Sequence, residues 1–463
     1  MNRLAQISYN SISVLFIAVL KISELYVLSS TLSPLDRGLF SLLTFYLLFS
    51  VLLSEMGIQN SIYSQSNIPV IKLRTLFWFN FVKSLVFYIL LTLLVFYLCF
   101  YYENENFYSF AIIGLVVLFN AFGKFYRSVL ITKGFLKQLS AVELISTFFE
   151  FSIVFIFISK LGVQSFVYGI LIKFLIDNIF YFFKLKGDLS LFGPISYSKI
   201  HEIIIIGVYD LFSQLVNFFT KEIDTLIITS FYGLEILGIF NVSKQLTLKP
   251  IRLISPILNN AFFPIFNKTK NNYIKFKKSL KIQLSINSFI ITMIFLFIMA
   301  LKEFLVSKFF PEQSSLNINF IFIFFILFSV LKGYWAPLGS LILTLGKTKQ
   351  AFQFNVFVFV FSVIVSLAFA YYFSVQWFAM SLLITTFLSF TLSYFIFYSK
   401  FILIDVYFKL TVLNAWPLFL IVVLDTYDLN FSSKVISLII ICLLFILTRF
   451  KMIKNAFSYI KNI

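Results

Sequence analysis

The chain has 463 residues, of which 60% are hydrophobic and only 12% are charged. A soluble domain would carry about 25% charged residues, so this composition excludes an ordinary soluble protein. The net charge of +18 does not indicate a nucleic-acid partner, because the basic residues are spread over short connections between apolar runs. Cys99 and Cys442 are isolated, and the sequence lacks metal-ligand spacings, phosphate-binding glycine loops and nucleophile–base sets. We therefore expect a protein without catalytic residues, metal or cofactor.

Apolar runs of about 20 residues, the length that crosses about 30 Å of hydrocarbon, recur from one end of the chain to the other. We predict an all-α polytopic membrane protein with about 14 transmembrane helices. The predicted helices cover roughly residues 6–30, 38–62, 76–100, 107–132, 140–160, 163–183, 203–231, 236–266, 283–306, 316–345, 350–373, 376–398, 408–424 and 434–449.

The connections between these helices alternate in charge. Most basic residues outside the helices lie in one set of connections, and the opposite set contains only Arg37, Lys160, Lys302, Lys308 and Lys434. Because basic connections stay on the cytoplasmic side, we predict that both termini are cytoplasmic. We expect neither a cleavable signal peptide nor a large soluble domain.

The first twelve helices form two similar sets of six. Three pairs of segments match: Thr132–Gln138 (TKGFLKQ) with Thr344–Gln350 (TLGKTKQ), Gly162–Ile172 with Ser374–Ile384 at the same offset, and more weakly Arg37–Ser41 with Leu237–Asn241. Because six is an even number, both sets have the same orientation, which is the arrangement of parallel repeats about an axis along the membrane normal.

The repeat predicts two six-helix lobes that enclose a central cavity. We place the N-lobe at residues 1–185, a cytoplasmic linker at 186–202, the C-lobe at 203–400 and two additional helices with a basic tail at 401–463. Such lobes suit alternating access with a substrate site near the middle of the membrane. Duplication also occurs in membrane proteins that transport nothing.

The predicted helix 236–266 carries Lys244, Lys249 and Arg252, and no acid follows Glu235 within it. A basic side chain near the bilayer centre costs roughly 2.5–3.5 kcal/mol, so each is normally paired or functional. At about 100° per residue the three fall within less than half of the helix circumference, and the last two lie roughly 20 and 24 Å along it. Pro250 favours a kink that protein or cavity water must accommodate. This basic stripe is expected to face water and to bind an anion.

Other charged residues lie at spacings that favour ion pairs. We expect pairs between Lys21 and Glu24, between Lys173 and Asp177, and, as a structural clamp between neighbouring helices, between Arg127 and Glu143.

Buried acids leave two interpretations open. Acids on other helices can neutralise the basic stripe, and the candidates are Glu24, Glu55, Glu150, Asp210 and Asp224. Alternatively, acids such as Asp210, Asp224, Glu24 and Glu55 can bind a coupling H⁺ or Na⁺. The two interpretations are compatible, because ion pairs in a cavity can open when an anionic substrate arrives.

Three segments resemble the polysaccharide flippase family. Ser30–Gln65 resembles its helix 1–2 region at Gly38 and Gly57, and Leu343–Gln350 resembles its helix 10–11 turn. Asp224–Lys268 resembles the helix 7–8 signature, and the matching positions are Asp224, Gly233, Gly238, Phe240, Lys244, Pro250 and Pro264. The likeness extends over nearly the whole chain, including the helix count. It identifies the chain as similar to the Wzx-type O-antigen and capsule repeat-unit flippases of the multidrug/oligosaccharidyl-lipid/polysaccharide exporter superfamily.

This resemblance implies a monomeric transporter of the bacterial cytoplasmic (inner) membrane. It implies movement of an undecaprenyl-diphosphate-linked glycan between leaflets, with membrane lipid and the polysaccharide polymerase and chain-length machinery as partners. A cationic cavity would hold the diphosphate. Lys244 corresponds to a family position, whereas Lys249 and Arg252 follow from their depth and facing, and Lys21 and Lys332 are further candidates on helices 1 and 10.

Three alternatives differ in substrate or class. A lipid-linked peptidoglycan precursor flippase shares the architecture. A drug/cation antiporter of the superfamily would carry cations, which a basic stripe repels. An O-antigen polymerase would need a large external loop, and the outer segments 302–315 and 425–433 are too short for one.

Overall fold

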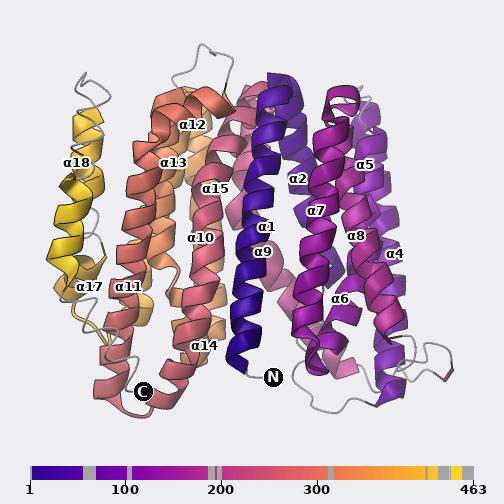
Figure 1. Ribbon diagram of the computed structural model, residues 1–463, viewed down its shortest axis with the longest axis horizontal. Helices are drawn as coiled ribbons and strands as arrows, with labels where there is room; N and C mark the ends of the chain where they lie inside the picture. Colours follow the sequence, from indigo (N-terminus) through magenta and orange to yellow (C-terminus); the bar gives the residue numbers. More distant parts are fainter. Residues whose placement is uncertain are drawn as a thin grey trace. The chain divides into compact units, whose positions relative to one another are not determined.

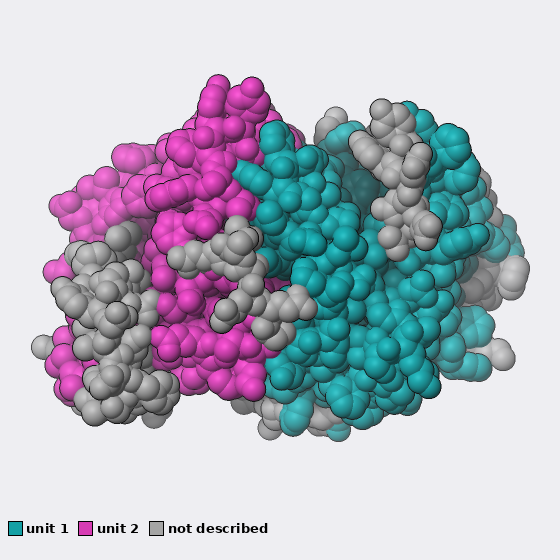
Figure 2. Space-filling model, turned by 90° about the horizontal axis from the view of Figure 1, so that it is seen from above, with its two compact units in different colours: residues 1–241 teal, residues 242–463 magenta. Residues whose placement is uncertain are grey.

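The computed structural model describes residues 3–55, 69–101, 107–185, 193–194, 201–310, 318–411, 416–425, 437 and 440–450. Within these residues the chain forms helices and no strands, so the all-α prediction is confirmed. Long helices lie side by side within each of two compact units, residues 1–241 and 242–463, which Figure 2 colours separately (Figures 1 and 2).

The first unit contains eight described helices and the start of a ninth. They are α1 (Arg3–Thr31), α2 (Pro34–Glu55), α4 (Val70–Tyr101), α5 (Phe107–Gly114), α6 (Val116–Thr132), α7 (Leu136–Leu161), α8 (Gln164–Leu185), α9 (His201–Tyr232) and the first turns of α10 (Leu234–Thr269).

The second unit contains the rest of α10 and the remaining helices. They are α11 (Tyr273–Ala300), α12 (Lys302–Phe309), α13 (Ile318–Trp335), α14 (Leu338–Leu345), α15 (Thr348–Tyr372), α16 (Val375–Ser393) with the π-helical turn η2 (Tyr394–Tyr398), α17 (Ile404–Leu410), α18 (Trp416–Asp425) and the short apolar helix Ile440–Phe450. The division between units follows spatial contacts and does not test the repeat, so the two six-helix lobes stay a prediction. Most of the predicted linker 186–202 lies outside the described residues.

Ten stretches of helix in the described residues are long and apolar enough to cross a membrane, which makes this a multi-pass membrane protein. α9 and α10 are not among the ten, although they contain 32 and 36 residues. In α10 the basic residues and Pro250, Pro256 and Pro264 interrupt the apolar run, yet the helix continues through all three prolines. The exact number of spans stays a prediction.

One predicted helix, 316–345, is broken into α13 and α14. Pro337 has no N–H and cannot continue the helical hydrogen-bond pattern. Side chains add donors to the carbonyls around the break: Asn287 Nδ2 donates to Gly333 O at 2.8 Å, and Asn259 Nδ2 donates to Ala336 O at 3.1 Å. The same carbonyls also accept from the amides of Ala336 and Gly339, at 3.2 and 3.4 Å. The predicted helices 107–132 and 283–306 are also interrupted, at Leu115 and Leu301.

The matched segments of the repeat form the same turn in both units. Gly134 follows α6 with φ 83°, and Gly346 follows α14 with φ 66°, a conformation that only glycine adopts without strain. The next amide donates five residues back in each case, from Phe135 N to Leu130 O and from Lys347 N to Ile342 O. This is the Schellman arrangement that closes a helix.

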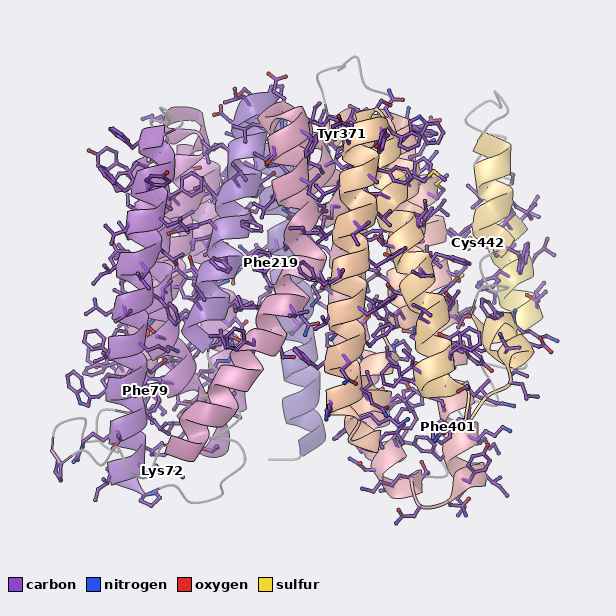
Figure 3. All side chains as sticks on the ribbon, turned by 180° about the vertical axis from the view of Figure 1, so that it is seen from behind. Lys72, Phe79, Phe219, Tyr371, Phe401 and Cys442 are labelled. Atoms are coloured by element: carbon purple, nitrogen blue, oxygen red, sulfur yellow. The ribbon has the colours of Figure 1, made fainter. Side chains whose placement is uncertain are left out.

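Apolar side chains cover the outer faces of the helices (Figure 3). Tyr371, Phe100 and Phe183 are among the most exposed, as expected for residues that contact lipid rather than water. Inside the first unit, Phe77, Phe125 and Leu130 belong to a core at the packed ends of α4, α6, α7 and α8.

Candidate functional site

The three basic residues of α10 differ in exposure. Lys244 is only 5% exposed, Lys249 is half-buried and Arg252 is exposed. With Lys244 set at 0°, Arg252 and Lys249 lie at about 80° and 140° around the helix. Lys244 thus belongs to the packed side with Leu248 and Ile251, and Arg252 and Lys249 form the accessible part of the basic stripe.

The five predicted anion-binding residues are divided between the units, with Lys21 in the first and the others in the second. Lys332 lies on α13, where its ammonium is 4.4 Å from the centre of the Phe328 ring. The joining of all five in one site stays a prediction.

A buried ion network links α1, α7 and α8. Lys21 Nζ lies 2.8 Å from Glu24 Oε2 and 2.6 Å from Glu150 Oε1, and Lys173 Nζ lies 3.5 Å from Glu150 Oε2. The side chains of Glu24 and Glu150 are only 4% and 1% exposed, whereas that of Lys21 is 29% exposed. The most exposed apolar residues of α1, such as Phe16 and Val19, lie on its opposite face. Lys21 therefore lies on the face of α1 opposite to these apolar residues.

The network corrects one sequence-based pairing. Lys173 was expected to pair with Asp177, one turn along α8, but its ion pair in the described structure is with Glu150 on α7. The Oδ1 atom of Asp177 is buried and has no hydrogen-bond partner within the described residues. No signal in the sequence connects Glu150 with Lys173, because the pair depends on how α7 packs against α8.

The other predicted acids have separate environments. Glu55 Oε1 lies 2.8 Å from Lys124 Nζ, and Lys83 Nζ donates to the adjacent Ser54 carbonyl at 2.7 Å. Asp224 is buried on α9. Asp210 falls within α9, but its side chain lies outside the described part of the structure.

The pair expected between neighbouring helices is present, because Arg127 Nη2 donates to Glu143 Oε2 at 3.1 Å. Three of the acids proposed to neutralise the α10 stripe, Glu24, Glu55 and Glu150, have lysine partners within the first unit.

A neutral polar cluster in the second unit was missed by the sequence argument. Gln283 Nε2 donates to Asn259 Oδ1 at 3.2 Å and to Ser340 Oγ at 2.9 Å, beside the α13–α14 break. The sequence did contain an indication of this cluster, because Pro and Gly interrupt the apolar span at Trp335–Gly339 (WAPLG). In transporters, spans interrupted in this way often lie at the binding site.

The two glycines matched by the weaker repeat, Gly38 on α2 and Gly238 on α10, meet at a close crossing. A Cβ atom on Gly238 would lie 2.9 Å from the Arg37 Cβ and 2.9 Å from the Gly38 nitrogen. A Cβ atom on Gly38 would collide with the Leu234 carbonyl. Only glycine allows the two backbones to approach this closely. Gly57, the other family position in this region, lies outside the described residues.

Comparison with solved structures supports the fold. The lipid II flippase MurJ in an inward closed conformation superposes with a TM-score of 0.71 and 15% identity, covering 96% of this chain and 99% of that chain. The chain thus shares its fold with the lipid II flippase MurJ.

Comparison with protein families and curated proteins adds sequence evidence. The polysaccharide biosynthesis protein family model matches residues 27–315. The teichuronic acid biosynthesis protein TuaB of Bacillus subtilis (strain 168) is 21% identical, covering 75% of this chain and 72% of TuaB. The amylovoran biosynthesis protein AmsL of Erwinia amylovora is 24% identical, covering 66% of this chain and 79% of AmsL. These matches agree with the motif resemblance to Wzx-type flippases, and the chain belongs to the polysaccharide biosynthesis protein family.

Proposed function

We propose that this protein is a flippase that moves an undecaprenyl-diphosphate-linked oligosaccharide from the inner to the outer leaflet of the cytoplasmic membrane by alternating access. The observation that carries the proposal is the basic stripe on α10, within a chain of this family and fold. The stripe offers Arg252 and Lys249 on an accessible side of a helix that is long enough to cross the bilayer.

The diphosphate is the part of this substrate that a basic stripe recognises. The guanidinium of Arg252 can bind phosphate oxygens in a bidentate manner, and Lys249 adds a point charge about one turn away. Lys244 supports the stripe from the packed side of the helix. Lys21 contributes only if the anion displaces Glu24 or Glu150, because both carboxylates now hold its ammonium.

The remaining parts of the proposal follow from the family. The protein works as a monomer in the inner membrane with both termini cytoplasmic, and it supplies repeat units to the polymerase and chain-length machinery. H⁺ or Na⁺ drives the cycle through buried acids.

The first prediction concerns Lys249→Ala, Arg252→Ala and the double variant, compared at matched membrane abundance. Each charged hydrogen bond to phosphate contributes about 1.5–3 kcal/mol, so each single change is expected to lower transport roughly tenfold or more. The readouts are surface polysaccharide and the leaflet that holds the lipid-linked repeat unit.

Lys268→Ala is the matched control, because it removes a lysine from the exposed last turn of the same helix. The site is wrong if the double variant transports as well as Lys268→Ala. Accumulation of lipid-linked peptidoglycan precursor instead of the polysaccharide repeat unit would favour the peptidoglycan flippase alternative.

A further inference from the structure

Among the described residues, the ion network of the first unit contains one carboxylate more than it has cations. Its members, together with the neighbouring clamp, are the acids Glu24, Glu143, Glu150 and Asp177 and the bases Lys21, Arg127 and Lys173. Lys124, the other basic residue of α6, is held by Glu55. An uncompensated charge inside a membrane protein is expensive, so the extra carboxyl group is expected to be neutral.

Asp177 is the member that the cations leave unpaired. Lys173, four residues before it, pairs with Glu150 across the helix contact, and Asp177 Oδ1 is buried without a hydrogen-bond partner in the described structure. The groups that face Asp177 from the packed helices are Glu143 and Ser146 on α7, Arg127 on α6, and Lys173 and Tyr181 on α8. Arg127 is itself bound to Glu143.

The internal repeat provides an uncharged counterpart of the same helix pair. The offset that matches Thr132–Gln138 with Thr344–Gln350 places Glu150, Lys173 and Asp177 on Ser362, Thr385 and Ser389 of α15 and α16. These three hydroxyl residues are buried. Thr385 Oγ1 donates to Leu382 O at 3.0 Å and Ser389 Oγ donates to Thr385 O at 2.7 Å, so both are satisfied by their own helix.

This comparison shows that such a helix pair can pack without ionisable side chains. The second unit packs the corresponding helices without any ionised group between Ala351 and Ser399. Because buried ion pairs add little net stability over neutral packing, stability alone does not explain why the first unit carries three ionisable side chains there.

We propose that Asp177 binds the proton that drives transport, and that Lys173 controls this binding by moving between Glu150 and Asp177. The inference rests on the proposed function, because a coupling proton has meaning only in a transporter. With Lys173 on Glu150, as here, Asp177 carries the proton as a neutral carboxylic acid. The spacing of four residues lets the Lys173 ammonium reach Asp177 by side-chain rotation.

The second state releases one proton and leaves the network with one net negative charge, because four carboxylates then face three cations. This charge favours the return of a proton to Asp177. When Lys173 moves to Asp177, the carboxylic O–H bond breaks, the proton passes to water on the other side of the membrane, and a Lys173–Asp177 ion pair forms. Glu150 keeps its contact with Lys21 at 2.6 Å, so no carboxylate loses its last cation.

The direct test follows the carboxylic acid of the purified full-length protein in lipid nanodiscs by infrared difference spectroscopy during a pH titration. Wild type is expected to show a protonated-carboxyl band that disappears as the pH rises, and Asp177→Asn is expected to lack it. Lys173→Met is expected to retain the band to a higher pH, corresponding to at least a tenfold lower proton concentration.

Asp405→Asn is the matched control, because it makes the same chemical change at an exposed carboxylate of α17 and is expected to leave the band unchanged. An unchanged band in Asp177→Asn would overturn the assignment of the proton to Asp177. Loss of the band on exchanging K⁺ for Na⁺ at constant pH would also overturn it in favour of a sodium site.

Transport measured with the same variants distinguishes the proposed proton site from the proposed flippase function. Asp177→Asn and the triple variant E150S/K173T/D177S, which copies the uncharged helix pair, are expected to insert normally and to lose pH-gradient-driven movement of the repeat unit. If both transport like wild type, the coupling role is wrong and the flippase proposal stands. If the infrared result holds but wild type moves no lipid-linked glycan, the proton site stands and the proposed function fails.

Discussion

The crossing of Gly38 and Gly238 shows how a single hydrogen in place of a side chain can determine where two helices meet. Both residues occupy equivalent positions of the weaker sequence repeat, and in the structure each would need to move the other's helix to accommodate a Cβ atom. Arg37, beside Gly38, is buried and donates from Nε to the Leu32 carbonyl at 2.9 Å, which fixes the start of α2. The contact therefore tolerates little change at either glycine.

At this scale we predict that Gly38→Val destabilises the protein. Forcing extra atoms into a packed contact typically costs about 1–3 kcal/mol, so the thermal unfolding temperature in detergent should fall. Gly339→Ala is the control, because the nearest atom to its added Cβ is 3.9 Å away, and helical Gly→Ala changes typically stabilise by roughly 0.5–1 kcal/mol. Equal unfolding temperatures for the two variants would contradict the close crossing.

At the scale of whole helices, α10 and α13–α14 respond differently to proline. α10 continues through three prolines, whereas the single Pro337 separates α13 from α14. Around Pro337 the freed carbonyls find donors on other helices, from Asn259 and Asn287. The break is thus stabilised by tertiary contacts that local sequence does not reveal.

We predict that Asn259→Leu weakens the second unit, since it removes the bond to the Ala336 carbonyl and leaves Gln283 with one partner fewer. A hydrogen bond of this kind typically contributes about 0.5–1.5 kcal/mol. Both former partners keep one other bond, because the Gly339 amide donates to Ala336 O and Gln283 donates to Ser340. Asn267→Leu makes the same change at an exposed position of α10 and should leave thermal unfolding nearly unchanged. If Asn259→Leu behaves like Asn267→Leu, these bonds do not hold the break.

The sequence predicted most helices closely because their signal is local. The expected helix 236–266 corresponds to α10, Leu234–Thr269, and the expected 350–373 corresponds to α15, Thr348–Tyr372. Local spacing also predicted the Lys21–Glu24 pair. It failed for Lys173, because Glu150 lies on another helix and only the packing of α7 against α8 brings the two together. The exposure of Lys244 likewise depends on neighbouring helices rather than on its own periodicity.

For the whole molecule, the helix pairs α7–α8 and α15–α16, which the predicted repeat matches, have different polar interiors. The first unit carries an ion network, and the described part of the second carries neutral amides and hydroxyls at the corresponding helix pair and around Pro337. This asymmetry suits a transporter in which one copy couples to an ion and α10 supplies the basic residues for the substrate. We propose that proton binding and substrate binding are parts of one transport cycle.

The measurement that tests the central claim most directly uses purified protein in liposomes that contain a polyprenyl-diphosphate-linked oligosaccharide. Movement of the glycan between leaflets is followed by its accessibility to an impermeant glycan-oxidising reagent. We predict that wild type moves this lipid, that the Lys249→Ala/Arg252→Ala double variant moves it at least tenfold more slowly, and that a polyprenyl glycoside without the diphosphate is not moved. Equal movement of both lipids, or unimpaired movement by the double variant, would contradict recognition of the diphosphate by α10.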